Sequence, residues 1–307
     1  MPNTPLVDPA LAPTVAPPQR HWYASLALSL GLRAGKTRLL SAAHQGPLRV
    51  QRAFYPEGAH CHLYWLHPPG GLVTGDELSL SADLLPGAQV LLTTPSAGKI
   101  YAVDGVDAAA ATRPLTAAAR PQLSRYTLNQ AEDSYLEWLP QETLVFNGAD
   151  ARIRTRFNLA ANARLFAWDL LCLGRPASNH GFNTGRCHSG FELWQDGRPL
   201  QIERTDLLAG DKLFGAPWGL QGAHTLGTCL ATLSLPRDEQ EDLLAALTAQ
   251  FGGADNIWGL TQKGPLLLVR YLGRDMAVAK AGCVFIWQHL RPKLINRPAC
   301  LPRIWAT

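Results

Sequence analysis

The sequence is short of charged side chains. Asp, Glu, Lys and Arg make up 17% of its 307 residues, against about 25% in an ordinary globular chain. The net charge is only +4, and no dense run of Lys and Arg with interleaved aromatic residues occurs, so nothing indicates nucleic-acid binding. Apolar content is nonetheless ordinary, at 47%. Few charges over a normal apolar content indicate a surface that other proteins cover.

Closely spaced cysteines and long apolar runs are also missing. The six cysteines are scattered, with no C-x-x-C pair, which is typical of reduced thiols in the cytosol. They are Cys61, Cys172, Cys187, Cys229, Cys283 and Cys300. Residues 22–32 are apolar but alternate with the period of a strand, unlike a signal peptide. No apolar run reaches transmembrane length, so we expect a cytoplasmic protein without a membrane partner.

The chain shows few domain breaks. Residues 1–20 hold six prolines and almost no periodicity, so we expect a disordered, proline-rich tail. The remainder, residues 21–307, reads as one domain that is long enough to bury a large core. Residues 105–121 are rich in alanine, and we interpret them as an insertion without an assigned structure.

The stretch from Glu57 to Asp76 shows the character of the whole chain. His60, His62 and Tyr64 fall on one face of an alternating segment, and alternation predicts a strand. A Pro-Pro-Gly-Gly corner follows, where proline removes ladder donors and glycine permits positive φ. A second alternating segment comes after the corner, so the pattern is strand, corner, strand.

Most of the remaining chain also has the period of a strand. Further strands are predicted at residues 22–32, 48–53, 89–94, 134–138, 142–146, 152–157 and 164–174. Helix patterns are scarce. One begins at Pro236 and ends at Gly252, and the other covers Met276–Leu290 and ends before Pro292. Because strands do not alternate with helices, the sequence predicts a mainly β protein with two α-helices near its C-terminus.

A self-sufficient active site is missing as well. The chain has no Ser-His-Asp order, no nucleophile elbow and no dinucleotide-binding glycine loop. His60 and His62 place two imidazoles on one strand face, a spacing that a metal site can use. The same spacing also suits two structural histidines, so both interpretations stay open.

Asp169 is the most informative acid. It stands in a strand that is apolar on both faces, where an unpaired charge is costly. Its carboxylate is therefore expected to pair with Arg175 or Arg204, or to lie on a wet polar channel. Two other acids have simple local roles: Asp76 caps its own turn, and Glu203 pairs with a neighbouring arginine.

Three arginines share the face of another strand. Arg152, Arg154 and Arg156 alternate with less polar residues, so their guanidinium groups lie on one side of the strand. Such a row is either a solvated face or a contact for an acidic partner. The sequence leaves both interpretations open.

Five motifs run in order along the chain. They are GPLRVQRAFYPEGAHCHLYWLHPPGGLVTGDEL at Gly46–Leu78, TTPSAGKIY at Thr93–Tyr101, LEWLPQETLVFNGA at Leu136–Ala149, AWDLLCLGRP at Ala167–Pro176 and LPRIW at Leu301–Trp305. In sequence, order and spacing they resemble the urease accessory protein D family (UreD, named UreH in some lineages). The resemblance covers residues 21–307, and motifs of this length are specific.

The resemblance implies a fold and a role. Members have no catalytic activity of their own, and their strands form long stacked, β-helix-like sheets with two helices. Such a protein is a chaperone-like scaffold that binds urease apoprotein and the accessory protein UreF, while UreF holds the GTPase UreG. UreE is the indirect nickel donor. The assembly inserts nickel, with CO2, into urease, so nickel is expected in transit through a polar tunnel and no cofactor is bound permanently.

The resemblance also implies site residues. The candidate nickel path consists of Asp76, Lys99, Asp169 and Glu203, and the candidate metal ligands are His60, His62 and His180. His180 stands where many members have Glu, so a carboxylate role does not transfer to it, although imidazole is itself a metal ligand. The arginines of the row at residues 152–156 are candidates for partner binding.

Two rival functions remain open from the sequence. One is a metal-dependent hydrolase built on His60, His62 and Asp76. The other is a β-rich interaction domain with no metal role. Urea hydrolysis by the purified protein with nickel would favour the first, and activation of apo-urease in cells lacking this protein separates a scaffold with a nickel role from the second.

Overall fold

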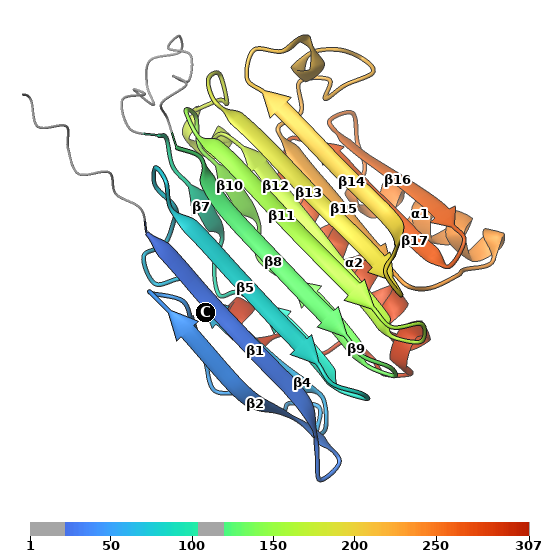
Figure 1. The fold of residues 1–307 in the computed structure, drawn as a ribbon. Helices are drawn as coiled ribbons and strands as arrows, with labels where there is room; N and C mark the ends of the chain where they lie inside the picture. Colours follow the sequence, from blue (N-terminus) through green and yellow to red (C-terminus); the bar gives the residue numbers. More distant parts are fainter. Residues whose placement is uncertain (1–21, 104–119, 307) are drawn as a thin grey trace, which may run out of the picture.

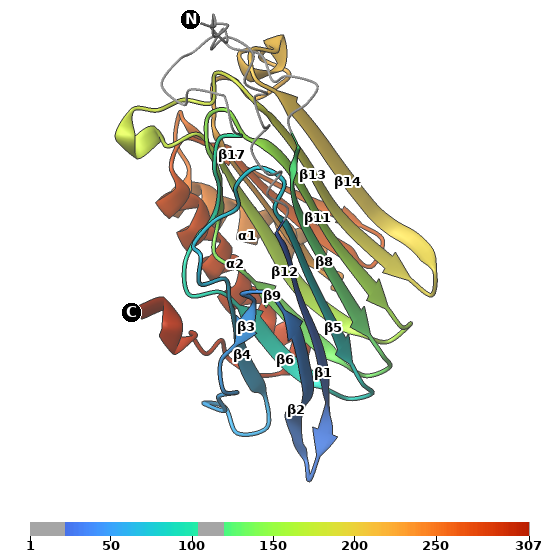
Figure 2. The same ribbon diagram turned by 60° about the vertical axis from the view of Figure 1, so that its left-hand side comes forward.

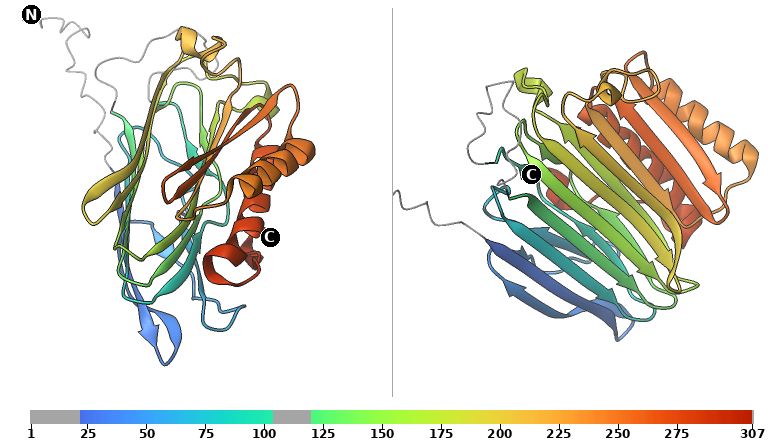
Figure 3. Two further views of the ribbon diagram at one scale, coloured as in Figure 1. Left: turned by 90° about the vertical axis from the view of Figure 1, so that its right-hand side faces the viewer. Right: turned by 45° about the horizontal axis from the view of Figure 1, so that its top comes forward.

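The protein consists of two large β-sheets that face each other, and both helices lie on the same sheet (Figures 1 and 3). The computed structural model describes residues 22–103 and 120–306. The expected tail at residues 1–20 and most of the alanine-rich stretch therefore lie outside the described residues. Among the described residues, α1 and α2 contact strands of only one sheet, which we call the covered sheet. The other is the open sheet.

The open sheet has seven strands in the spatial order β14-β13-β11-β8-β5-β1-β2. Their bounds are β1 Tyr23–Arg33, β2 Lys36–Gln45, β5 Glu77–Leu84, β8 Gln122–Gln130, β11 Asp150–Leu159, β13 Arg186–Gln195 and β14 Arg198–Leu208. Within this sheet, β1, β5, β8, β11 and β13 pair in parallel, each with the next. An antiparallel hairpin, β1–β2 or β13–β14, ends the sheet on each side.

The covered sheet has ten strands. Eight of them follow the order β16-β17-β15-β12-β9-β6-β4-β3, while β10 pairs with β12 and β7. Their bounds are β3 Arg49–Val50, β4 Cys61–Leu66, β6 Gln89–Thr93, β7 Gly98–Ile100, β9 Tyr135–Leu139, β10 Thr143–Val145, β12 Arg164–Leu173, β15 Thr225–Ala231, β16 Asn256–Lys263 and β17 Leu266–Gly273. Strands β4, β6, β9 and β12 are parallel, whereas β15, β17 and β16 add to β12 in antiparallel fashion.

The chain alternates between the two sheets as it winds. Strands β4, β6, β9 and β12 of the covered sheet alternate in sequence with β5, β8, β11 and β13 of the open sheet. Each coil therefore places a strand in each sheet beside a parallel neighbour (Figure 2), and two coils add the short strands β7 and β10 to the covered sheet. This winding confirms the expected mainly β fold with stacked, β-helix-like sheets.

The helices confirm the predicted number, but one predicted end is wrong. They are α1 Arg237–Phe251 and α2 Met276–Ile295. Helix α2 continues through Pro292, because its last turn is held by tertiary contacts: Leu294 is buried, and Arg164 donates a 2.5 Å hydrogen bond to its carbonyl. Asn296, at a φ of 55°, then caps the helix. Over the described part of the chain, neither helix combines the length and the apolarity needed to cross a membrane.

Strand β12 separates two apolar cores. Ala167 and Leu171 belong to the core between the sheets, whereas Trp168 and Leu170 belong to the core beneath the helices. Successive side chains of a strand point to opposite faces. Asp169 therefore points into the space between the sheets, where its neighbours on that face are apolar.

Candidate functional site

Two cavities, each partly open to solvent, share Asp169 as a lining residue. One has a volume of about 410 Å³ and is also lined by Lys99, so we call it the Lys99 cavity. The other, of about 310 Å³, is also lined by Glu203 and is called the Glu203 cavity. Both linings draw residues from the two sheets. The accessible part of the Asp169 side chain thus faces space inside the sandwich.

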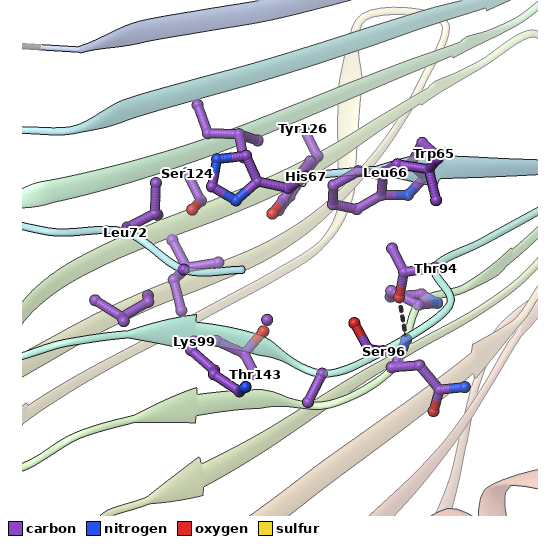
Figure 4. Close-up of a pocket in the computed structure, with 18 of the residues that line it drawn as sticks. Trp65, Leu66, His67, Leu72, Thr94, Ser96, Lys99, Ser124, Tyr126 and Thr143 are labelled. Carbon is purple, nitrogen blue, oxygen red and sulfur yellow. Dashed lines mark hydrogen bonds between the residues drawn. The ribbon is translucent and has the colours of Figure 1, made fainter. Parts of the chain in front are cut away.

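The Lys99 cavity is lined by imidazole, hydroxyl and ammonium groups. His67, Ser124 and Tyr126 lie along one wall, and Lys99 and Thr143 lie along the other (Figure 4). The wall with Lys99 is fixed because β7 and β10 pair in parallel, which sets Lys99 opposite Leu144. Asp169 is the only acid among the described lining residues. The cavity therefore offers a cation neutral hydroxyl and imidazole groups and one carboxylate, while the ammonium group of Lys99 opposes a cation by its charge.

The Glu203 cavity contains a second acid that is already paired. Arg270 of β17 lies 2.9 Å from Glu203 Oε2, and the Thr228 hydroxyl donates to Glu203 Oε1 at 3.2 Å. The expected pairing of Glu203 with a sequence-adjacent arginine is wrong, because Arg204 points to the outer face and pairs with Glu192 instead. Glu203 thus bridges from the open sheet to the covered sheet.

Asp169 has no arginine partner among the residues that the structure describes. Arg175 stacks over an aromatic ring and Arg204 lies on the outer face, so neither of the expected salt bridges forms. Burial and the charge of Glu203, partly opposed by a hydrogen bond from Ser189, together raise the pKa of Asp169 to about 6. Of the two expected roles for this acid, the salt bridge is therefore wrong, and the position on a polar channel stays a prediction.

Asp76 lies beside the Lys99 cavity. Its carboxylate accepts a 3.0 Å hydrogen bond from the Val73 backbone N–H, which confirms that it caps its own turn. It also acts on His67, a cavity residue: burial lowers the pKa of His67, and the Asp76 charge partly opposes that change. His180 is exposed on a turn after β12 and lines neither cavity. The structure therefore brings four path candidates to the cavities or their margin and leaves His180 apart.

His60 and His62 are buried in a separate cluster next to α2, which we call the α2 network. His60 Nε2 lies 3.0 Å from Glu137 Oε2, and His62 Nε2 lies 2.7 Å from Glu57 Oε1. Arg291 of α2 joins the two pairs, with nitrogen-to-oxygen distances of 2.6 Å to Glu57 and 2.7 Å to Glu137. The histidines thus contact acids and lie close to a buried arginine.

The α2 network has metal-like spacing but is filled by an arginine. The ligand atoms of Glu57, His60 and His62 lie within 4.8 Å of one another. However, Arg291 donates to both oxygens of Glu57, at 2.6 and 2.8 Å, and so supplies the positive charge that a cation would supply. Asp76, the third residue of the hydrolase hypothesis, is not part of this group. The geometry favours structural histidines.

The sequence did not single out Glu57, Glu137, Arg270 or Arg291. The signal for Glu137 was present, since it stands in the apolar strand β9 just as Asp169 stands in β12. Arg291 offered a similar signal, because it interrupts the apolar surface of α2. Their partners are not visible in the sequence, since Arg291 is 234 residues from Glu57.

Comparison with known proteins places the whole described fold in one family. Residues 23–306 match the family model described as UreD urease accessory protein. A protein from Saccharophagus degradans named urease accessory protein UreD is 47% identical over 297 residues, which are 96% of this chain and 96% of that protein. Proteins of the same name from Klebsiella pneumoniae and Klebsiella aerogenes are each 42% identical, over 96% and 95% of this chain and 99% of their own lengths.

Proposed function

Because this chain belongs to the UreD urease accessory protein family, we propose that it is a scaffold that guides nickel during urease maturation. It binds urease apoprotein and the UreF–UreG complex, and UreE supplies the nickel indirectly. GTP hydrolysis by UreG accompanies insertion. The protein itself catalyses no reaction, holds nickel only in transit and works in the cytoplasm.

The observation that supports the nickel role is the position of Asp169 between the two cavities. Asp76 lies at the margin of the Lys99 cavity, and Glu203 lies in the cavity on the other side of Asp169. The described lining residues offer carboxylate, hydroxyl and imidazole groups and no cysteine. Oxygen and nitrogen ligands suit a cation that must bind and leave again, whereas several thiolates would retain it.

Arg270 sets a condition on this path. Its guanidinium holds Glu203, and the two side chains are 43% and 26% exposed. A Ni²⁺ ion that uses Glu203 must therefore displace Arg270 or pass beside the pair. A partly exposed pair of this kind is worth little, so its opening is compatible with transit.

The rival without a metal role differs in a testable respect. In an interaction domain that only binds partners, Asp169 is dispensable for nickel delivery even though it lines both cavities. The hydrolase rival draws no support from the site, because the α2 network separates His60 and His62 from Asp76. Purified protein incubated with Ni²⁺ and urea is expected to show no turnover, and turnover would revive that rival.

Complementation tests the proposed function. Cells that express urease and the other accessory proteins but lack this chain receive either the native protein or Asp169→Asn. We expect the native protein to restore urease activity, and we expect the variant to form the same complexes but to leave urease poor in nickel by elemental analysis. A matched control is Asp238→Asn, an exposed acid in the first turn of α1. If the native protein restores no activity, the proposed function is wrong. If urease from cells with Asp169→Asn contains the full amount of nickel, the interpretation as an interaction domain without a metal role remains.

A further inference from the structure

The outer face of the open sheet carries no covering element among the described residues, in contrast to the covered sheet (Figures 1 and 3). Arginines project from the strands of this face. They are Arg125, Arg152, Arg154, Arg156, Arg186 and Arg204, and we call them the arginine face. The alternation of buried and exposed residues along β11 confirms that the three arginines of the sequence row share this side.

The strand register gathers these arginines. Arg125, Arg154, Gly190 and Arg204 are successive partners across β8, β11, β13 and β14. With about 4.8 Å between neighbouring strands, the three guanidinium groups of this row start from backbone positions that span about 14 Å. Arg152 and Arg156 extend the group along β11, each about 6.6 Å from Arg154 at the usual rise of a strand.

A buried acid lies at the centre of the arginine face and pairs with two of its arginines. Glu192 accepts hydrogen bonds from Arg154 at 2.9 Å, from Arg204 at 3.4 Å and from the Trp194 indole at 3.2 Å. Its side chain is 1% exposed, whereas those of Arg154 and Arg204 are 52% and 59% exposed. Gly190 lies between the two arginines in the register and has no side chain to separate them from Glu192. The Glu192 carboxylate therefore lies below the protein surface, and the guanidinium groups of Arg154 and Arg204 cover it and face the solvent.

Two further acids on this face are also less exposed than their arginines, whereas Asp206 is 46% exposed beside Arg186 at 45%. Glu77 is 19% exposed beside Arg125, and Asp150 is 11% exposed at 3.8 Å from Arg152, while both arginines are 52% exposed. A guanidinium has five N–H donors, and each of these pairs uses only some of them. The remaining donors face the solvent, so the surface presents arginine even where the pairs are neutral overall.

This arrangement differs from a merely solvated row of charges. Burying Glu192 is costly unless it is paired, and the pairing fixes the arginines. Arg156 is held as well, because it stacks 4.2 Å from the Trp194 ring and donates to Asn158 at 2.8 Å. Side chains that are already ordered lose less entropy on binding, and the planar guanidinium matches a carboxylate in bidentate fashion.

We propose that the arginine face docks onto an acidic surface of a folded protein in the urease maturation machinery, an inference that rests on the proposed function. The occupant follows from charge and shape complementarity: a broad sheet face with ordered guanidinium donors fits surface carboxylates of Asp and Glu. Exposed ion pairs across such an interface act strongly on association rate and specificity, so binding is sensitive to salt.

Charge reversal away from Glu192 tests the docking surface. The variant Arg125→Glu with Arg152→Glu leaves the buried acid paired, and Arg125→Gln with Arg152→Gln removes the charges without adding acids. The control is Arg237→Glu, a residue of α1 whose side chain is 90% exposed. Binding to purified apo-urease and to purified UreF–UreG is measured by interferometry at two chosen NaCl concentrations, about 50 and 300 mM, where the Debye length is about 14 Å and about 5.5 Å.

For at least one of the two partners, we expect the Glu variant to bind at least about 10-fold more weakly and the Gln variant to be intermediate. The native affinity for that partner should fall with salt, and the control should stay within about twofold. Unchanged affinity of both variants for both partners overturns the proposal. So does tighter binding of the native protein to a DNA duplex than to either partner, with loss of the DNA binding in the Arg125 and Arg152 double variants. If the native protein also activates urease in cells, only the docking surface fails. If it does not, the proposed function fails.

Discussion

Replacing Asp169 with asparagine separates the energetic cost of this acid from its function. Asparagine has nearly the same size and still accepts a hydrogen bond, but it carries no charge at any pH. Burial and the charge of Glu203 raise the pKa of Asp169 from 3.8 to about 6. A shift of about 2 units corresponds to about 3 kcal/mol, which is the destabilisation that the ionised carboxylate causes in the folded protein.

The direction of the pH dependence follows from this shift. The folded protein holds the proton of Asp169 more tightly than the unfolded chain does. The stabilising effect of the protonated acid is complete below the unfolded pKa of 3.8 and is lost as pH rises through about 6. As the pH rises from 4 to 7.5, the free energy of unfolding of Asp169→Asn should therefore increase by up to about 3 kcal/mol relative to that of the native protein.

Urea denaturation of the native protein and Asp169→Asn at a series of pH values measures this difference. The control, Asp238→Asn, should differ from the native protein by less than about 0.5 kcal/mol at every pH. A constant difference between Asp169→Asn and the native protein would refute the argument, because the carboxyl would then have the same pKa in both states. A variant that is more stable yet delivers less nickel would show that the acid is kept for transit.

Other changes test the α2 network and the Glu203 cavity. Arg291→Met leaves two buried carboxylates without their shared cation and should lower the free energy of unfolding in urea by about 3–5 kcal/mol. The control, Arg237→Met, should change it by less than about 0.5 kcal/mol. Equal effects of the two variants would contradict the role of Arg291 in the α2 network. The pKa of Glu57 is lowered to about 2, because hydrogen bonds from a histidine and Arg291 outweigh the opposing effect of burial. The stability that Glu57 supplies should therefore be complete above pH 4.5 and disappear as the pH falls toward 2, and circular dichroism should show a smaller acid transition for Glu57→Gln. Arg270→Gln frees its acid partner and should raise the affinity for Ni²⁺ in calorimetry, with an unchanged affinity meaning that Arg270 does not compete with the ion.

Periodicity predicted the individual strands well, because alternation reports which residues of a strand face the core. It correctly predicted the apolar strand around Asp169 and the shared face of Arg152, Arg154 and Arg156. It does not report which strands are neighbours. The winding between two sheets therefore came from the family resemblance, since parallel partners lie a full coil apart in the sequence.

The candidate site was predicted only in part, because periodicity shows on which face of a strand a residue lies and does not show which residue it contacts. An acid in an apolar strand is visible in the sequence, so Asp169 was found and Glu137 was available to the same argument. The partners were not visible, because Glu203 meets Arg270 across the space between the sheets, 67 residues away in the sequence. Adjacent residues of a strand point apart, which explains why the expected pairing of Glu203 with its sequence neighbour was wrong.

The link between Arg291 and Glu57 has a consequence for synthesis on the ribosome. The two residues are 234 positions apart, and at about 5–20 residues per second the ribosome needs roughly 12–47 s to translate that interval. During this time the early coils exist without the helix that neutralises their acids and covers their apolar strands. The nascent chain therefore exposes strand edges for most of its translation, and the α2 network can close only when nearly the whole chain has been synthesised.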